Sequence, residues 1–375
     1  MIHWCGTGLS AVPGLRRLIE AGHEVTVWNR TEEKARDAVG DLTDNIRVFD
    51  PTMLKEVVEA GDVVVSMLPA TWHVPLAEMA VEQGAHFVSS SYIAPEMRDL
   101  DSAAKAAGVS LVNEVGLDPG IDHLMAHDLM RAYRESDAFD PENALSFLSY
   151  CGGVPKIANA FRYKFSWAPV GVLKALRSPS RSIRQFSELE VSRPWDALGR
   201  YDAPLDPPET FEVYPNRDSL PFMAEYGFEP GWKVKDFVRG TLRLNGWAEA
   251  WKDVFATVET ADDAALEELA AELLAENAYE EGEPDRVVLC VSLEAAKDGV
   301  PVWHKTWVMD AWGDARGTAM ARLVSIPVAL AVEAVLDRAI PVGVHAAPSD
   351  PKLVSAWMGE IDRLAQHLAL VDRLA

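Results

Sequence analysis

The chain has few cysteines and little positive charge. Its three cysteines, Cys5, Cys151 and Cys290, are odd in number and widely spaced, which excludes a disulfide framework and a cysteine zinc site. Its 35 basic and 58 acidic side chains give a formal net charge of −23 over 375 residues. That balance argues against nucleic acid or an anionic membrane surface as a partner. We also predict no metal site.

Long apolar runs are missing as well. No stretch reaches the ~18 apolar residues that span a bilayer, and no basic start followed by an apolar segment marks a secretory signal. The hydrophobic content of 49% and the charged content of 25% are typical of a globular protein. We therefore expect a cytoplasmic protein without membrane segments, and the length favours two domains.

The first motif follows a short apolar opening. Gly6-Thr7-Gly8-Leu9-Ser10-Ala11 fits the Gly-x-Gly-x-x-(Gly/Ala) turn that lets a backbone approach a dinucleotide pyrophosphate at a helix N-terminus. Helical periodicity and then an alternating strand follow, so a strand–turn–helix–strand unit fits in about 28 residues. The pattern predicts a dinucleotide site; a plain structural turn is the alternative.

The residues at the end of the second strand distinguish a preference for NAD from one for NADP. A fold that prefers NAD usually carries an acidic residue there, which binds the ribose 2′-hydroxyl. This chain has Asn29-Arg30-Thr31 instead. Because a basic side chain suits a 2′-phosphate, the sequence favours NADP(H), with NAD possible.

The first 117 residues alternate between short apolar strands and helices. This order predicts an α/β fold with a Rossmann-type, doubly wound parallel sheet that helices cover on both faces. Strands are expected at residues 2–4, 25–28, 46–49, 63–67, 86–90 and 110–112, and helices near 13–21, 31–39, 51–60, 74–83 and 97–107.

The pattern changes after Ser146. Longer aromatic and β-branched segments, broken by Gly and Pro, predict a second α+β domain with a mixed, mostly antiparallel sheet. A later apolar helix near 318–340, in which Pro327 should cause a kink or mark the start, is expected to pack on the first domain. The expected division is a discontinuous NADP-binding domain, a substrate-binding and dimerisation domain, and a C-terminal helical segment: residues 1–118 with 317–350, residues 119–316, and residues 351–375.

Ligands of open parallel sheets bind at the carboxyl ends of the strands. The hydroxyl groups of residues 89–92 could bind ribose, nicotinamide or a substrate carboxylate, although a serine-rich turn is the alternative. Asp118 and Asp122 could be a turn former and a helix N-cap, or could supply a proton acceptor and a binder of a cationic nitrogen beside a nicotinamide. His123, in the first turn of a helix, is expected to be structural more often than catalytic.

Basic side chains are concentrated in one segment. Residues 151–190 hold seven basic and two acidic side chains, a local charge of +5. This predicts an anionic small-molecule ligand, because guanidinium groups bind carboxylates through paired hydrogen bonds. A solvated strand face is the alternative. Arg217 in a predicted turn and Arg243 at a predicted strand end are the stronger candidates.

Several segments together form a recognisable pattern. They are 113–123 (Asn-Glu-Val-Gly-Leu-Asp-Pro-Gly-Ile-Asp-His), 148–153 (Leu-Ser-Tyr-Cys-Gly-Gly), 163–167 (Tyr-Lys-Phe-Ser-Trp), 214–218 (Tyr-Pro-Asn-Arg-Asp), 239–243 (Arg-Gly-Thr-Leu-Arg), 318–321 (Thr-Ala-Met-Ala) and 326–328 (Ile-Pro-Val). In order and over nearly the whole chain, this pattern resembles the glutamate-forming, NADP+-dependent saccharopine dehydrogenases, also called saccharopine reductases.

The resemblance implies an oxidoreductase of lysine metabolism that acts on a secondary amine. NADP+ would take a hydride from the lysine-side carbon of saccharopine, and water would split the imine into glutamate and 2-aminoadipate 6-semialdehyde; the reverse reaction is equally possible. The resemblance also implies a homodimer formed through the sheet of the middle domain.

The resemblance further implies site residues. Tyr92, Asp118 and Cys151 match positions near the substrate amine and the nicotinamide, where Asp118 would accept or relay a proton. The substrate-binding positions are Ser91, Arg217, Thr241, Leu242 and Arg243. With the glycine motif included, the cofactor-binding positions are Gly6, Gly8, Leu9, Ser10, Ala11, Val12, Asn29, Arg30, Thr31, Asp50, Leu68, Ser89 and Ser90.

Two departures leave the substrate more open than the reaction. Leu9 stands where family members place Phe, and Val154-Pro155-Lys156-Ile157 replaces the usual Leu-Pro-Ala-Pro. One alternative is a related NADP-dependent imine reductase or dehydrogenase for another amino-acid or polyamine conjugate. The other is a non-catalytic NADPH-binding regulator.

Overall fold

The computed structural model describes residues 1–374, which divide into two compact units. Unit 1 comprises Met1–Leu124 and Ala321–Gly359, and unit 2 comprises Met125–Met320 and Glu360–Ala375. Each unit is built around its own sheet, and the two sheets differ in strand direction.

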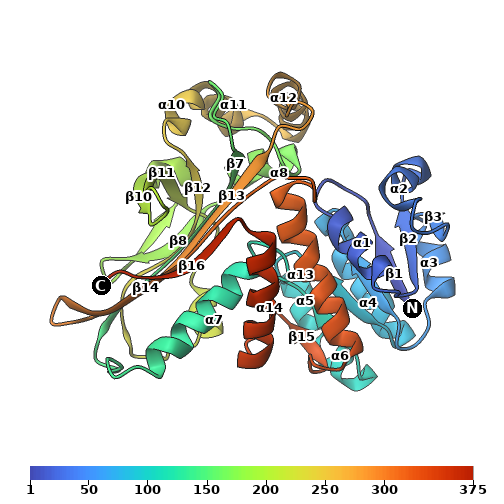
Figure 1. Cartoon of the computed structure of the whole chain (residues 1–375), viewed down its shortest axis with the longest axis horizontal. Helices are drawn as coiled ribbons and strands as arrows, with labels where there is room; N and C mark the ends of the chain where they lie inside the picture. Colours follow the sequence, from blue (N-terminus) through green and yellow to red (C-terminus); the bar gives the residue numbers. More distant parts are fainter. Residues whose placement is uncertain (375) are drawn as a thin grey trace. The chain divides into compact units, whose positions relative to one another are not determined.

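Unit 1 contains a parallel sheet in the strand order β15-β6-β5-β4-β1-β2-β3. The order reverses beside β1, which pairs with both β2 and β4, and a ligand crevice forms at such a reversal. The elements, most of them labelled in Figure 1, are β1 (Ile2–Cys5), α1 (Val12–Glu20), β2 (Val25–Asn29), α2 (Glu32–Val39), β3 (Ile46–Val48), α3 (Pro51–Val57), β4 (Val63–Ser66), the short 3₁₀ helix η1 (Ala70–Trp72), α4 (His73–Gln83), β5 (His86–Ser89), α5 (Pro95–Asp99), α6 (Asp101–Ala107), β6 (Ser110–Val112), most of α13 (Ala319–Leu336), β15 (Gly343–His345) and the start of α14 (Pro351–Leu364). The predicted Rossmann-type sheet is confirmed.

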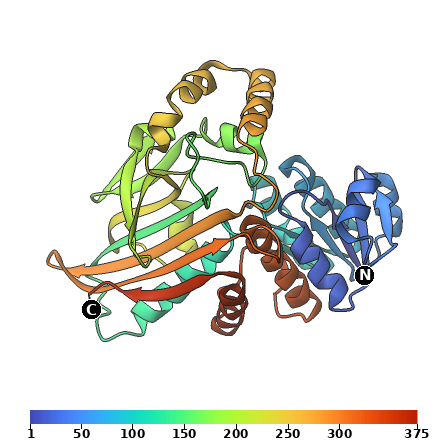
Figure 2. The same ribbon diagram turned by 45° about the horizontal axis from the view of Figure 1, so that its top comes forward.

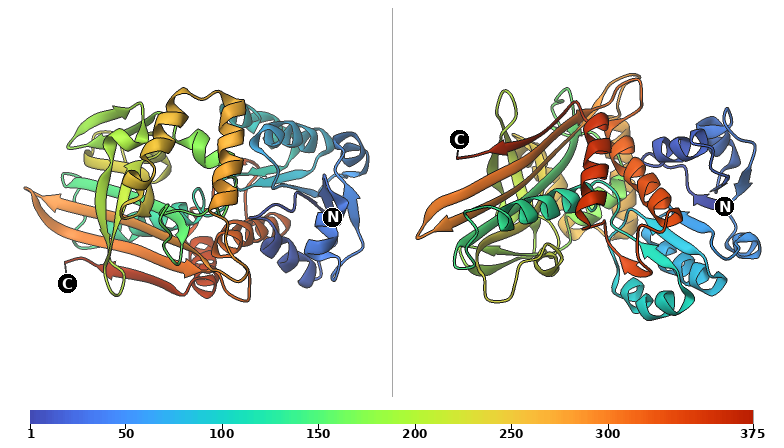
Figure 3. Two further views of the ribbon diagram at one scale, coloured as in Figure 1. Left: turned by 90° about the horizontal axis from the view of Figure 1, so that it is seen from above. Right: turned by 60° about the horizontal axis from the view of Figure 1, so that its bottom comes forward.

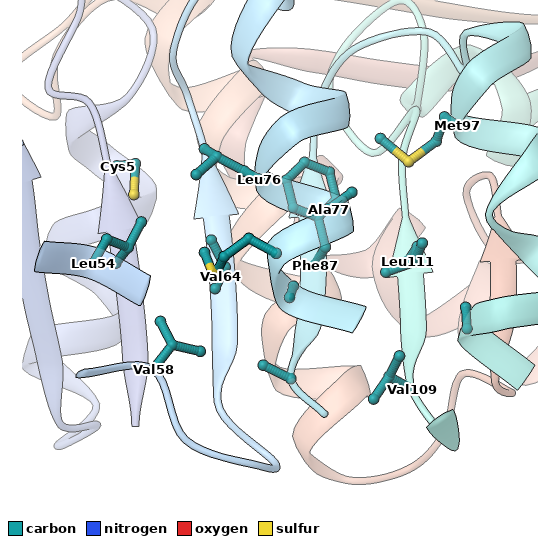
Figure 4. Packing of buried hydrophobic residues seen from close by; sticks show 14 of the residues in the cluster. Cys5, Leu54, Val58, Val64, Leu76, Ala77, Phe87, Met97, Val109 and Leu111 are labelled. Carbon is teal, nitrogen blue, oxygen red and sulfur yellow. The ribbon is translucent and has the colours of Figure 1, made fainter. Parts of the chain in front are cut away.

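One face of this sheet packs on α3, α4, α5 and α6. Val64 and Phe87 from the strands contact Leu54, Leu76 and Met97 from these helices, and all five side chains are buried (Figure 4). Their strand positions are apolar in succession because both faces of a doubly wound sheet are covered.

The other face includes α1 and α13, whose backbones lie very close together. A methyl group on Gly14 would stand 2.0 Å from the Ser325 carbonyl oxygen, and the Gly14 N–H donates to Ser325 Oγ over 2.8 Å. Helix α13 begins at Ala319 and continues through Pro327, which therefore does not mark its start. Among the described helices, α13 alone has the length and composition of a membrane span, and 83% of that window is buried.

Unit 2 contains a mixed, mostly antiparallel sheet in the order β10-β11-β12-β7-β13-β14-β16, with β8 and β9 attached to β12. Only the β7–β12 pair is parallel among the described strands of this sheet. This confirms the predicted sheet type. The elements are most of α7 (Ile121–Arg134), β7 (Ala144–Pro155), α8 (Pro169–Ala175), β8 (Ser180–Arg184), β9 (Ser187–Val191), the 3₁₀ helix η2 (Pro194–Ala197), β10 (Gly199–Ala203), β11 (Glu209–Pro215), α9 (Pro221–Glu225), β12 (Lys233–Leu244), α10 (Trp247–Ala250), α11 (Lys252–Thr260), α12 (Asp263–Glu276), β13 (Asp285–Lys297), β14 (Val300–Trp312) and β16 (His367–Asp372).

The long β13–β14 hairpin dominates this sheet, with the red strand β16 along its outer edge (Figure 2). Helix α7 lies along the sheet (Figure 3, right), where the Trp307 indole N–H donates to Asp128 over 2.9 Å.

Two local expectations were wrong. Residues 367–372, assigned to a C-terminal helical segment, form β16, because the apolar alternation of His-Leu-Ala-Leu-Val-Asp pairs with the free edge of β14. The helix expected at 97–107 is two helices that meet at Leu100.

Candidate active site

The glycine turn at the start of unit 1 adopts the backbone that its sequence predicts. Gly6 has φ +106°, and a Cβ there would lie 2.9 Å from the Met67 carbonyl oxygen, so only glycine fits. At Gly8 a Cβ would meet nothing within 4 Å, and Leu9 is 65% exposed. The turn is therefore tight toward the sheet and open on its outer side.

Helix α1 starts without a side-chain cap. Its N-cap is Ala11, whose side chain accepts no hydrogen bond, and Pro13 occupies the first turn. Val12 is the first helical residue and Ser10 precedes the cap, both half-buried. An uncapped helix start beside an open glycine turn suits the pyrophosphate of a dinucleotide.

The segment after β2 lies against this turn. Asn29 accepts a hydrogen bond from the Thr7 N–H over 3.2 Å and donates to the Thr31 carbonyl oxygen over 2.8 Å. Arg30 is exposed and forms no hydrogen bond or ion pair with residues 1–374. A guanidinium without a protein partner at this strand end fits a 2′-phosphate.

Two other predicted cofactor positions have different surroundings. Leu68 stands beside the turn, since its Cδ2 would be 3.3 Å from a Cβ on Gly6. Asp50 caps α3, where its carboxylate accepts from the Thr52 N–H over 2.8 Å and the Met53 N–H over 3.0 Å.

The serines after β5 are tied to neighbouring strand ends. Ser89 donates to Asn113 Oδ1 over 2.9 Å at the end of β6, and both are buried. Ser90 is half-buried, and Ser91 Oγ lies 2.8 Å from His73 Nε2. His73 is not predicted from the sequence, because a histidine near a helix start carries no signal of its own.

Tyr92 and Asp118, predicted as catalytic residues, meet in unit 1. The Tyr92 hydroxyl donates to Asp118 Oδ1 over 3.1 Å, at the carboxyl edge of the sheet. The Gly116–Gly120 turn presents Asp118: the Gly116 N–H donates to the Pro119 carbonyl oxygen over 2.9 Å. Both side chains are half-buried, so a phenol and a carboxylate share one partly exposed place.

Glu114 and His123 form a buried pair behind that turn. His123 Nε2 lies 3.0 Å from Glu114 Oε2, and Glu114 Oε1 accepts the Ile93 N–H over 2.8 Å. His123 has no exposed surface, so the structure favours a structural role for it. Asp122 is also fully buried and accepts the Gly120 N–H over 2.7 Å, which makes it part of the turn.

In unit 2, strand register brings Cys151 beside the predicted carboxylate-binding segment. Cys151 on β7 is the register partner of Thr241 on β12, so their side chains share one face of the sheet. Both buried neighbours, Leu242 and Gly152, belong to the opposite face, where a methyl on Gly152 would stand 2.2 Å from the Leu242 carbonyl oxygen. This close approach explains the glycine after Cys151.

Arg243 is a buried cation among aromatic rings. It is 6% exposed, and its guanidinium carbon lies 4.9 Å from the ring centre of Tyr163, 5.6 Å from Tyr214 and 5.5 Å from Trp247. Its register partner Glu212 instead accepts the backbone N–H groups of Gly246 and Ala248, over 2.9 and 2.8 Å.

No carboxylate among residues 1–374 forms an ion pair with Arg243, and its Nε has no hydrogen-bond acceptor. Its Nη1 donates to the Leu242 carbonyl oxygen over 3.3 Å. Burying a cation without a counterion is unfavourable, so the site is suited to an anionic ligand.

Arg217 lies in the turn after β11 with φ +57°. It is exposed, and its carbonyl oxygen accepts the Arg181 N–H over 3.0 Å. A non-glycine residue held in the left-handed region costs about 1 kcal/mol or more and is common at ligand sites.

Four of the seven basic side chains in segment 151–190 form ion pairs. Lys164 pairs with Glu283, Lys174 and Arg177 with Asp263, and Arg181 with Glu188 and Asp218. Three of these acids lie outside the segment, so the local charge of +5 in the sequence is partly compensated in the fold. The anionic small-molecule ligand predicted from this segment stays a prediction.

Two family models cover most of the chain. The saccharopine dehydrogenase NADP binding domain matches residues 3–112, and the saccharopine dehydrogenase C-terminal domain matches residues 116–364. The saccharopine dehydrogenase [NADP(+), L-glutamate-forming] of Pyricularia oryzae is 29% identical, over 95% of this chain and 95% of its own. The Schizosaccharomyces pombe protein of the same name is 28% identical, over 96% of both.

Solved structures give the same result. The apo saccharopine dehydrogenase (L-Glu forming) of Saccharomyces cerevisiae superposes with a TM-score of 0.80 at 27% identity, over 99% of both chains. The homospermidine synthase of Legionella pneumophila, solved with NAD, has a TM-score of 0.67 at 9% identity over 99% of this chain and 91% of that one, which shows a shared fold alone. The chain belongs to the saccharopine dehydrogenase family.

Proposed function

We propose that this chain is an NADP-dependent oxidoreductase that interconverts saccharopine with glutamate and 2-aminoadipate 6-semialdehyde. The relatives that match over nearly their whole length are saccharopine dehydrogenases of the NADP+, L-glutamate-forming type. The reaction breaks a C–H bond next to a secondary amine and then hydrolyses an imine. Its catalyst must bind a dinucleotide, move protons at nitrogen and hold several carboxylates.

The Tyr92–Asp118 hydrogen bond carries this proposal. It joins a phenol and a carboxylate at the carboxyl edge of the sheet that also carries the glycine turn. Bound NADP+ supplies the hydride acceptor. Asp118 accepts the amine proton or relays it to water, while the Tyr92 hydroxyl, by donating to Asp118, limits its basicity.

The residues around the glycine turn fit the cofactor. The open side of Gly8 and the uncapped start of α1 would hold the pyrophosphate, and Arg30 would hold the 2′-phosphate. Ser89 and Ser90, at the end of β5, would contact the nicotinamide half.

Arg243 would bind a substrate carboxylate. It is buried, positively charged and without a carboxylate partner in the described chain, so an anionic ligand supplies the charge that the fold omits. Thr241 and Cys151 share its side of the sheet, and Arg217 would bind a second carboxylate from its turn.

The direct test follows NADPH formation by absorbance with saccharopine and NADP+, and then with NAD+. We expect turnover with saccharopine and a clear preference for NADP+. If carboxylated polyamines are oxidised and saccharopine is not, the substrate assignment is wrong. If no amine is oxidised while NADPH still binds, a regulator is the better description.

Replacing Asp118 tests the chemistry. We expect Asp118→Ala to lower kcat with saccharopine at least tenfold, because a general base typically contributes 10²-fold or more. NADPH binding, followed by its fluorescence, should stay near the wild-type value. Unchanged turnover would remove Asp118 from the mechanism.

We also propose a homodimer in the cytoplasm. Strand β16 is an edge of the unit 2 sheet, and Leu370 on it is exposed, so this edge can extend across a twofold axis. Light scattering after size exclusion measures the mass, and a monomer at micromolar concentration would contradict the dimer. Cell fractionation tests the location.

A further inference from the structure

A chain of three side chains runs under the end of β5. His73, at the start of α4, places Nδ1 2.9 Å from Ser66 Oγ and Nε2 2.8 Å from Ser91 Oγ. His73 and Ser66 are buried, Ser91 is half-buried, and the imidazole lies edge-on to Phe87. The imidazole therefore joins a strand end of the core to a residue of the proposed substrate site.

The protonation of this chain follows from counting donors and acceptors. Ser66 Oγ has no hydrogen-bond partner but His73 within residues 1–374. If Nδ1 carried the proton, the buried Ser66 O–H would have no acceptor, which is the costlier arrangement. The Ser66 O–H therefore donates to Nδ1, and the proton of the neutral imidazole is on Nε2.

The same reasoning gives the direction of the hydrogen bond between His73 and Ser91. The His73 Nε2–H donates to Ser91 Oγ, so the Ser91 hydroxyl does not need to donate back to the imidazole. Its own O–H can then donate to another acceptor. Burial lowers the pKa of His73 to about 4, so the imidazole is neutral near pH 7 and this direction persists.

We propose that His73 is a positioning residue: it holds Ser91 as a hydrogen-bond donor toward a carboxylate of the amino-acid substrate. This inference rests on the proposed function. The next residue supports a substrate rather than a cofactor partner, because Tyr92 donates to Asp118, where the reacting amine would bind. Without His73, the Ser91 hydroxyl rotates freely and loses this preference.

The test is a double-mutant cycle between His73→Asn and Ser91→Ala. Asn can reach the position of Nδ1 and Ser66 but not Ser91. We expect each variant to raise the KM for saccharopine about tenfold, the loss of one hydrogen bond to a charged group. The KM of the double variant should be no higher than that of either single variant, because both changes remove the same interaction. The kcat and the KM for NADP+ should stay within about twofold.

His73→Gln is the rescue variant. Its amide reaches the position of Nε2 and can still donate to Ser91, so we expect its KM within about threefold of wild type. The matched control is His86→Asn, a half-buried histidine of the same sheet whose Nδ1 accepts the Ser110 N–H over 2.9 Å, and it should leave the KM unchanged. If the His73→Asn protein does not fold, Ser66→Ala takes its place in the cycle.

The outcomes separate the two proposals. Wild-type protein without saccharopine turnover would overturn the proposed function. If the wild type turns over saccharopine but the His73→Asn and Ser91→Ala effects on the KM multiply in the double variant, only the positioning role is overturned. The same holds if His73→Asn and His73→Gln have equal KM values for saccharopine. A rise in the KM for NADP+ in place of the KM for saccharopine would show that Ser91 donates to the nicotinamide carboxamide, which also contradicts the proposal.

Discussion

The two units position their candidate site residues in different ways. In unit 1 these residues lie in turns and at strand ends, and neutral groups fix them: Ser91 through His73, and Ser89 through Asn113. In unit 2 all of them except Arg217 lie within long strands, and Arg243 is a buried charge without a carboxylate partner in the described chain.

The two units therefore differ in whether their polar site residues already have partners in the protein. In unit 1 the hydroxyl groups of Ser89 and Ser91 already have hydrogen-bond partners in the protein before a ligand arrives. In unit 2 the buried Arg243 guanidinium has no carboxylate partner among residues 1–374, so an anionic ligand would supply its counterion. Four comparisons between variants test this contrast, in order of decreasing expected effect.

The sharpest comparison is between two buried arginines of unit 2. Arg286 binds Asp310 through two contacts of 2.7 Å and Glu209 through one of 2.8 Å. Arg286→Met leaves two carboxylates unpaired and should lower the free energy of unfolding by about 3–5 kcal/mol. Arg243→Met leaves no carboxylate unpaired, so the ligand-free protein should lose at most about 1 kcal/mol.

The binding effects should be reversed. Arg243→Met should raise the KM for saccharopine about a hundredfold, because a buried charge contact is lost. Arg286→Met, where it folds, should change this KM little. Urea unfolding and steady-state kinetics measure both quantities. Equal destabilisation by the two variants would mean that Arg243 is paired within the protein.

The His73 imidazole predicts an acid-sensitive unit 1. Burial lowers its pKa to about 4 in the folded state, while the unfolded value is about 6.5. Between these values the unfolded state binds more protons, so the stability from this group is complete above pH ~6.5. It is lost as the pH falls toward 4, by about 3 kcal/mol in total.

His73→Gln should remove this part of the pH dependence. Burial also lowers the pKa of His3, His86 and His304, so wild type and variant share a common slope, and their difference isolates His73. Urea unfolding at pH 7.5 and 4.5 measures it. If the free energy of unfolding changes equally with pH in wild type and variant, His73 is already protonated at pH 4.5 in the folded protein.

Alanine substitutions of Gly8 in the glycine turn and of Gly14 in α1 should have opposite effects on stability and on cofactor binding. Gly14→Ala places a methyl 2.0 Å from the Ser325 carbonyl oxygen and should destabilise the protein by about 1–3 kcal/mol. Gly8→Ala meets nothing within 4 Å and should leave the melting temperature unchanged while raising the KM for NADP+. A stable Gly14→Ala protein would show that α1 and α13 can separate at little cost.

The smallest effect concerns cofactor choice. Arg30→Ala removes an exposed guanidinium, so we expect the KM for NADP+ to rise about tenfold and the KM for NAD+ to stay the same. Raised ionic strength should weaken NADP+ binding by wild type more than by the variant. Equal changes with the two cofactors would place the 2′-phosphate elsewhere.

The sequence alone determined the sheet of unit 1 and its ligand edge. Short apolar strands, the Gly6–Ala11 turn and the residues after each strand are local patterns, and parallel topology collects them at one edge. The Tyr92–Asp118 contact links two such strand ends; the strand-end pattern named both residues, and the family resemblance brought them together near the substrate amine. Local chemistry sufficed because each residue is placed by its own strand.

Only the tertiary structure decided the rest. Cys151 meets Thr241 through strand register across about 90 residues of sequence, which no local pattern reports. Lys174 and Lys164 of segment 151–190 pair with the distant Asp263 and Glu283, and Arg243 has no carboxylate partner because Glu212 binds backbone N–H groups instead. His73 became visible only when folding brought Ser66 and Ser91 to its two nitrogens. Ion pairing and burial depend on distances in space, and a sequence gives only distances along the chain.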